Sequence, residues 1–175
     1  NEVIKAANNG CLILGICNGF QILTETGLLK GALLQNEKLK FLSKDIYIKV
    51  IDNKNKFCNK YTGGQVLRLN IAHNEGNYFT NSNHLKELED KNLIAFKYSD
   101  SNGNTNLENN PNGSLKNIAG IILEEDVLLG GEESGGIAIK THIPERDGIW
   151  MGLTLWEYMV KSGKTLEELI DEVYE

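Results

Sequence analysis

Apolar and polar positions alternate along the chain in a way that predicts a mixture of strands and helices. Residues 11–16 are mostly apolar and predict a buried strand, and residues 18–26 continue from it with a helical pattern. Residues 1–10 predict the end of a preceding helix. In residues 41–51 and 65–71 apolar residues recur at every second position, which predicts two strands that pair antiparallel beside the main sheet.

The second half of the chain continues this mixture of elements. Residues 28–34 are apolar but contain glycines, and we expect a loop there; residues 102–114 are rich in Asn and Gly and predict another. Residues 130–136 are mostly Gly and Glu and predict a flexible loop. The remaining elements are strands at 93–99, 118–123 and 127–129, and helices at 84–91, at 149–163 and from Thr165 onward.

The turn that joins the first strand to its helix is the most informative segment. It reads Gly15-Ile16-Cys17-Asn18-Gly19, the layout of a nucleophile elbow with cysteine in place of serine. Such a turn lifts Cys17 above the sheet edge, and the helix N-terminus favours its thiolate. We expect the glycines to avoid Cβ clashes and the Asn18 N–H to hold an oxyanion. The alternative is a buried cysteine before an ordinary strand-to-helix turn.

Composition favours a globular α/β domain and excludes several other classes. The 175 residues carry a net charge of −6, are 41% hydrophobic and 24% charged, and intersperse basic with acidic residues, so we expect no nucleic-acid partner. No apolar run has the length of a membrane span, and no signal-peptide pattern is present. The odd cysteine count predicts reduced thiols in the cytoplasm, with Cys11 and Cys58 as structural thiols. No Cys/His spacing suits zinc, so we expect no metal or cofactor.

Several motifs in order along residues 1–128 resemble the class I glutamine amidotransferases, and most closely the glutaminase subunits or domains of phosphoribosylformylglycinamidine synthases. The resemblance implies a three-layer, flavodoxin-like α/β sheet. Because the family's opening strands and its glycine-rich oxyanion loop have no counterpart before Asn1, we expect an N-terminally truncated sheet. Asn74 stands where the family has glycine. The motifs are the elbow with Phe20 and Gln21, residues 26–34, 71–78 and 110–114, and Asn117-Ile118-Ala119-Gly120-Ile121.

The resemblance also implies an activity. Cys17 would be the nucleophile that attacks the glutamine amide, Gly15, Asn18 and Gly19 would bind the oxyanion and substrate, and Gln21 would line the glutamine pocket. The products would be glutamate, released through a thioester, and ammonia. A large synthetase subunit or domain would use that ammonia in purine biosynthesis.

The histidines allow more than one interpretation. The family ends its triad in His-Pro-Glu, and here His142-Ile143-Pro144-Glu145 takes that place with one extra residue. His142 is therefore either the catalytic base, oriented by Glu145, or a loop histidine of the C-terminal segment. His73 either matches a family motif or caps a strand.

Residues 129–175 resemble a different family, the phosphoglucomutases and phosphomannomutases. The segment from Leu129 to Gly136 resembles their sugar-binding loop, and the resemblance implies that Glu132 and Ser134 contact sugar hydroxyls. The phosphoserine loop and metal-binding aspartates of such mutases are missing, so we expect no mutase reaction. The chain therefore reads as two family fragments: a natural fusion, an engineered chimera or a generated sequence. The alternative function is a non-catalytic remnant with a sugar-phosphate-binding tail.

Overall fold

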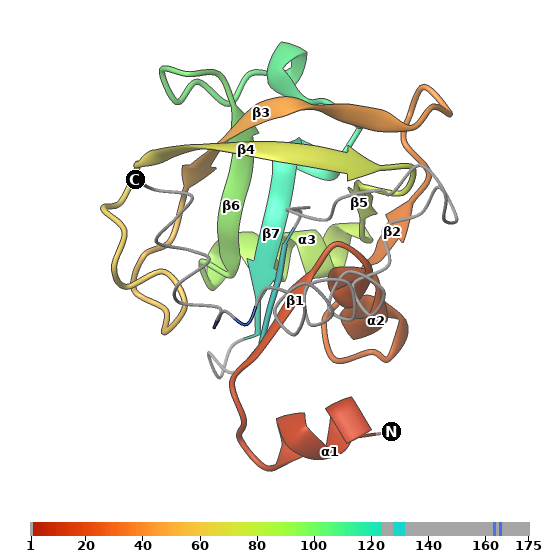
Figure 1. The fold of residues 1–175 in the computed structure, drawn as a ribbon, viewed down its shortest axis with the longest axis vertical. Coiled ribbons are helices and arrows are strands. Elements are labelled where there is room, and N and C mark those ends of the chain that lie inside the picture. The colour runs from red at the N-terminus through yellow and green to blue at the C-terminus, as the bar shows by residue number, and fades with distance from the viewer. Residues whose placement is uncertain (1, 124–127, 132–162, 164, 166–175) are drawn as a thin grey trace. The chain divides into compact units, whose positions relative to one another are not determined.

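A computed structural model describes residues 2–123, 128–131, 163 and 165. The chain divides into two units, residues 1–134 and 135–175, and nearly all of the described residues belong to the first. Figure 1 shows the elements of that unit. They are α1 (Glu2–Asn8), β1 (Ile13–Ile16), α2 (Asn18–Glu25), β2 (Ala32–Leu34), β3 (Leu42–Val50), β4 (Val66–His73), β5 (Asn77–Phe79), α3 (Ser82–Asp90), β6 (Ile94–Ser99), two 3₁₀ turns η1 (Leu107–Asn109) and η2 (Leu115–Asn117), β7 (Ile118–Ile122) and β8 (Leu128–Gly131).

Six strands form one mixed sheet in the order β1-β8-β7-β6-β3-β4, and β2 pairs with β5 in a small separate sheet. In the larger sheet β1 and β8 are parallel, and the other neighbouring strands are antiparallel. The predicted α/β class is confirmed, as is the antiparallel pairing of the strands predicted at 41–51 and 65–71. Their expected place beside the main sheet is wrong, because β3 also hydrogen-bonds to β6 and so joins the pair to the larger sheet.

The elbow strand β1 is an edge strand among the described strands, and its neighbour β8 comes from far along the chain. Ile13 is in register with Leu128 and Gly15 with Gly130. Gly130 is required because a Cβ there would lie 2.1 Å from Cδ2 of Phe20 on α2. β8 can therefore fit beside α2 only with a glycine at this position.

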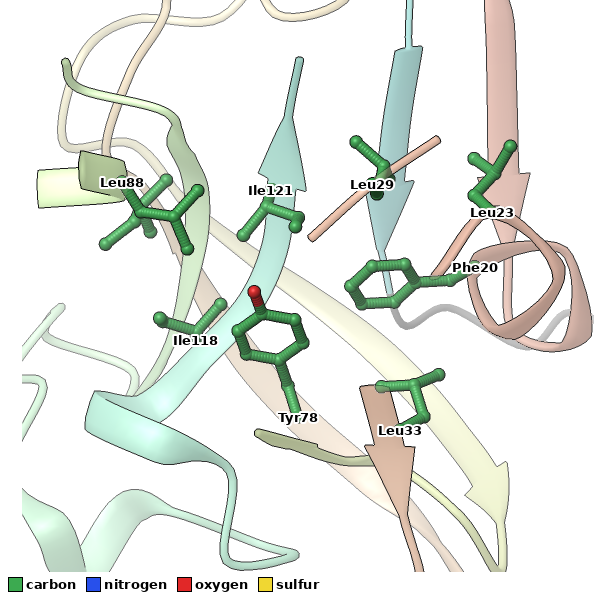
Figure 2. Close-up of a cluster of buried hydrophobic side chains, with 9 residues drawn as sticks. Phe20, Leu23, Leu29, Leu33, Tyr78, Leu88, Ile118 and Ile121 are labelled. Carbon is green, nitrogen blue, oxygen red and sulfur yellow. The ribbon is translucent and has the colours of Figure 1, made fainter. Parts of the chain in front are cut away.

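The main core lies between the sheet and the helices α2 and α3. Phe20 and Leu23 of α2 are almost fully buried, as is Tyr78 of β5, and the Phe20 and Tyr78 rings stack with centroids 5.8 Å apart. Figure 2 shows these side chains converging with Leu33, Leu88 and two isoleucines of β7. Burial of these apolar groups fixes α2, and so the start of that helix, against the sheet.

Several details differ from the sequence-based expectations. Residues 32–34 form β2 rather than loop, because they hydrogen-bond to β5, a strand that the apolar pattern did not indicate. Gly130 and Gly131 lie in β8 rather than in a flexible loop. The strand at 11–16 is not buried on both faces: Leu12 and Leu14 are 57% and 52% exposed, because β1 packs through Ile13 and Gly15 on its other face. The helices predicted at 149–163 and from Thr165 lie outside the described residues.

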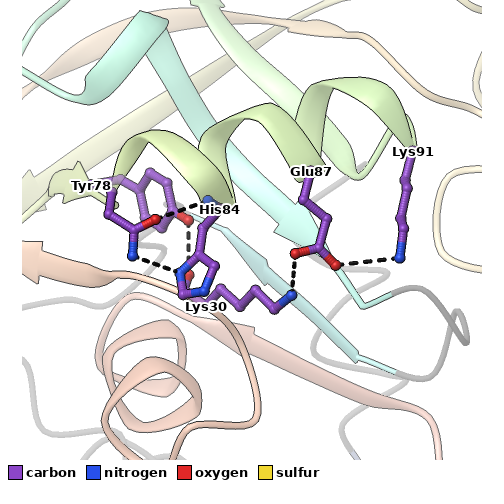
Figure 3. Close-up of polar contacts among 6 residues, drawn as sticks. Lys30, Tyr78, His84, Glu87 and Lys91 are labelled. Carbon is purple, nitrogen blue, oxygen red and sulfur yellow. Dashed lines mark hydrogen bonds and ion pairs between the residues drawn. The ribbon is translucent and has the colours of Figure 1, made fainter.

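A polar cluster joins the loop before β2 to α3. Glu87 pairs with Lys30 and Lys91, and these two lysines lower the pKa of its carboxyl (Figure 3). The Tyr78 hydroxyl donates to the Lys30 carbonyl over 2.8 Å, and burial raises the pKa of Tyr78 to about 12. Asn81 caps α3 by accepting a hydrogen bond from the His84 N–H at 2.9 Å. No described helix is both long and apolar enough to cross a bilayer.

Candidate active site

Cys17 occupies a strained backbone position between β1 and α2. Its φ of 53° and ψ of −113° lie in a region that favours glycine, and the residue serves as the N-cap of α2. Its N–H donates to the Gly131 carbonyl over 3.2 Å, and its carbonyl accepts from the Gln21 N–H over 3.1 Å. Backbone bonds on both sides of the turn thus hold the strained residue, which is the geometry predicted for a nucleophile elbow.

The two glycines of the elbow have different roles. A Cβ at Gly15 would lie 2.5 Å from Cδ1 of Leu23 and 2.7 Å from the Gly19 carbonyl oxygen, so only glycine lets α2 approach β1 this closely. A Cβ at Gly19 would meet nothing within 4 Å. The expectation that both glycines prevent clashes therefore holds for Gly15 and is wrong for Gly19, because the added methyl group at Gly19 would face open space.

The three cysteines have different surroundings. The Cys17 Sγ is half-buried and lies 3.9 Å from Oδ1 of Asn18. Cys58 is 1% exposed, and burial raises the pKa of its thiol, which agrees with a structural role. Cys11 is exposed, so its expected structural role is wrong, because it lies in the open segment between α1 and β1.

Gln21, predicted to line a glutamine pocket, meets a segment distant in sequence. Its Nε2 donates to Oε1 of Glu25 over 2.9 Å and to Oε2 of Glu75 over 3.4 Å. Glu75 lies in the turn between β4 and β5, so the fold brings this turn to the helix that starts at Cys17. The sequence reasoning did not single out Glu75; the signal was a charged residue inside the motif that runs from Ile71 to Tyr78.

His73 ends β4 and is 5% exposed. Its Nδ1 lies 3.1 Å from Oδ1 of Asn36, and its ring packs where a Cβ on Gly76 would be, at 2.2 Å. Of the two interpretations left open, these contacts favour a histidine that shapes the end of the strand.

The remaining predicted site residues lie outside the described part of the chain: His142 and Glu145 of the predicted triad, and Glu132 and Ser134 of the predicted sugar loop. Among the residues that are described, no three His, Cys, Asp or Glu side chains gather in a way that could hold a metal ion.

The segment that contains the elbow matches a known protein family. Residues 2–126 match the family of CobB/CobQ-like glutamine amidotransferase domains. The chain belongs to this family. The amidotransferase match contains β1, α2, the Glu75 turn and every strand of the sheet except β8.

Relatives of this amidotransferase chain confirm the predicted resemblance. Phosphoribosylformylglycinamidine synthase subunit PurQ of Pseudothermotoga lettingae is 52% identical over 129 residues, which are 74% of this chain and 53% of that protein. The subunit of the same name from Sulfurimonas denitrificans is 47% identical over 149 residues, 85% of this chain and 65% of that protein. The chain thus spans between about half and two thirds of these relatives.

A solved structure confirms the predicted fold of the amidotransferase class. A chain in the structure of PurLQS from Thermotoga maritima matches with a TM-score of 0.63 and 34% identity, over 90% of this chain and 66% of that one.

The predicted second resemblance is also confirmed. Residues 106–175 match the α/β/α domain III of phosphoglucomutases and phosphomannomutases. The two family matches overlap over residues 106–126, which include β7, and β8 falls in the second match alone. The strand that hydrogen-bonds to the elbow strand therefore lies beyond the amidotransferase family match, although the 149-residue match to the Sulfurimonas denitrificans PurQ subunit includes it.

Proposed function

We propose that this chain is the glutaminase component of a phosphoribosylformylglycinamidine synthase. It would hydrolyse glutamine to glutamate and pass ammonia to a large synthetase subunit in the cytoplasmic synthesis of purines. The observation that carries the proposal is Cys17, held with φ 53° at a strand-to-helix elbow in a member of a glutamine amidotransferase family. The PurQ relatives supply the choice of synthase.

The proposed reaction follows nucleophilic catalysis by a thiolate. The Cys17 Sγ attacks the side-chain carbonyl carbon of glutamine, and the Asn18 N–H, next in the chain, supports the negative charge on the oxygen. The carbon–nitrogen bond breaks, the nitrogen takes up a proton and leaves as ammonia, and a glutamyl thioester remains. Water then cleaves the carbon–sulfur bond and releases glutamate. His142 is the candidate for moving these protons and Glu145 the candidate for orienting it.

Glutamate release from glutamine tests the proposal. The full chain is assayed beside Cys17→Ala and Cys11→Ala, the latter a matched control because Cys11 is exposed. We expect Cys11→Ala to retain the rate and Cys17→Ala to lose it by roughly three orders of magnitude or more, as for other nucleophile replacements. Equal glutamate release by the full chain and Cys17→Ala would refute the proposal.

A second candidate function is a non-catalytic scaffold whose tail binds a sugar phosphate. The match of residues 106–175 to a phosphohexomutase domain favours it. Isothermal titration with glucose 1-phosphate and with glucose 6-phosphate tests the tail, and absence of heat with both argues against it. Rates of thiol alkylation test the elbow: the scaffold predicts that Cys17 reacts no faster than the buried Cys58.

A further inference from the structure

A buried asparagine, Asn36, holds the turn between β4 and β5. Asn36 is 1% exposed, and its side-chain amide makes four polar contacts. Nδ2 donates to the Lys40 carbonyl at 2.8 Å and to the His73 carbonyl at 3.0 Å. Oδ1 accepts from the Gly76 N–H at 3.0 Å and lies 3.1 Å from the His73 ring nitrogen Nδ1. Asn36 therefore fixes both ends of the four-residue turn that contains Glu75.

A second buried asparagine, Asn112, holds the same turn at the carbonyl of Gly76. Asn112 is also 1% exposed, and its Nδ2 donates to the Gly76 carbonyl over 2.7 Å and to the Tyr98 hydroxyl over 3.0 Å. Gly76 is thus held at its N–H by Asn36 and at its carbonyl by Asn112. Buried amide hydrogen bonds of this kind are costly to break, so the turn has one well-defined conformation.

This turn presents Glu75 to the helix of the elbow. The Glu75 carboxylate is exposed and accepts from Gln21, which follows Cys17 by four residues, a helical rise of about 6 Å. Four bonds of about 1.5 Å separate the amide carbon of glutamine from its α-amino nitrogen, so these two atoms lie about 5 Å apart when the side chain is extended, a similar distance. Glutamine whose amide carbon meets the Cys17 sulfur can therefore place its cationic amino group near Gln21 and the Glu75 carboxylate.

We propose that Asn36 is a positioning residue for the proposed glutaminase reaction. It acts through Glu75: by fixing the turn at 73–76 it sets how well the amino-acid end of glutamine binds, without changing the reactivity of Cys17. This role rests on the proposed function.

Two alkylating reagents separate the two effects in the full chain. Iodoacetamide reports thiolate reactivity and access alone. The diazoketone analogue of L-glutamine carries the amino-acid end; it loses N₂ as the Cys17 sulfur bonds to its terminal carbon, which takes up the thiol proton. Peptide mass spectrometry gives the rate at Cys17 with each reagent, and the ratio of the diazoketone rate to the iodoacetamide rate measures recognition of the amino-acid end.

The variant Asn36→Ala is compared with Asn55→Ala. Asn55 is a matched control because it is equally buried and also holds a turn, with side-chain hydrogen bonds confined to residues 52–58. We expect the ratio to fall about tenfold in Asn36→Ala, the effect of losing one hydrogen bond to a charged group, and to stay unchanged in Asn55→Ala. The iodoacetamide rate at Cys17 stays within twofold in both variants.

A double-mutant cycle distinguishes positioning from general destabilisation. Glu75→Gln alters an exposed side chain and lowers the ratio by itself, and we expect Asn36→Ala to lower it no further in that background. If Asn36→Ala does not fold, Asn36→Asp keeps the acceptor oxygen toward Gly76 and replaces it in the cycle, with a smaller fall expected.

Two results would overturn the role of Asn36. The first is that Asn36→Ala leaves the ratio unchanged while the unmodified chain strongly prefers the diazoketone. If the alanine variant does not fold, the same result in Asn36→Asp has the same meaning. The second is a fall that is equally large in the Glu75→Gln background. A different result would contradict the proposed function itself: in the unmodified chain the diazoketone would react at Cys17 with no preference over Cys11. The proposed role of Asn36 would then be refuted as well.

Discussion

Replacing Gly15 by alanine tests how closely the elbow helix must approach its strand. The new Cβ would lie 2.5 Å from the Leu23 side chain and 2.7 Å from the Gly19 carbonyl oxygen. Leu23 is 1% exposed and the second contact is backbone, so neither neighbour can move without shifting α2. Overpacking of this kind costs about 1–3 kcal/mol, and we expect Gly15→Ala to fall in the upper half of that range.

Gly19→Ala is the matched control within the same motif. Its Cβ would meet nothing within 4 Å, and Gly19 lies in the first turn of α2 without a positive φ. Alanine in place of glycine at such a helical position stabilises by roughly 0.5 kcal/mol. The two substitutions, four residues apart on either side of the elbow turn, should therefore change stability in opposite directions.

Native-state hydrogen exchange of the α2 amides measures both effects locally, which is necessary because the chain contains two units. We expect exchange of the amides of residues 21–25 to become faster in Gly15→Ala and slower, or unchanged, in Gly19→Ala. Thermal unfolding should agree, with a shift of roughly 2–4 °C per kcal/mol for a chain of this length. If Gly15→Ala leaves α2 exchange unchanged, the close contact between β1 and α2 is not a constraint and the reasoning is refuted.

Three further changes have definite expected outcomes. Cys17→Gly should unfold at a higher temperature than Cys17→Ala, the reverse of the usual order, because only glycine relieves the strain at φ 53°; the usual order would contradict the strained elbow. Glu87→Gln should be less stable than the unmodified chain at neutral pH. The pKa of Glu87 is lowered in the fold, so this difference in stability should vanish as the pH falls below 4.5, the ordinary pKa of a glutamate, and then through the lowered pKa. Urea titrations measure the difference, and one that persists at low pH would contradict the pairing with Lys30 and Lys91. Because burial raises the pKa of Tyr78 to about 12, its contribution to stability should be complete below pH 10 and lost as the pH rises toward 12. Tyr78→Phe should remove that part of the alkaline loss, and an identical loss in both proteins would contradict the assignment.

The parts of the fold that the sequence could predict are those with strong local signals. The elbow at Cys17 was predictable because apolar strand, glycine-flanked turn and helix follow one another within about fifteen residues. The strands β3 and β4 were predictable because one face of each is apolar at every second residue.

The parts that were missed depend on distant partners. β2 and β5 are three-residue strands with no periodicity of their own, and they exist because they pair with each other. β8 contains two glycines, which locally indicate a loop, yet Gly130 is needed because Phe20 packs against it. Glu75 could not be linked to Gln21 from spacing alone, because two buried asparagines from other loops set the turn that brings them together.

The pairing of β1 with β8 has a consequence for how the protein matures. The peptide N–H of Cys17 is held by the carbonyl of Gly131, so the elbow cannot reach its final form until the chain has been synthesised as far as residue 131. Contacts between such distant residues form slowly because a long loop must close first. A nascent chain arrested before β8 would carry the Cys17 sulfur on an unanchored strand, and the elbow would form only after residue 131 has been added.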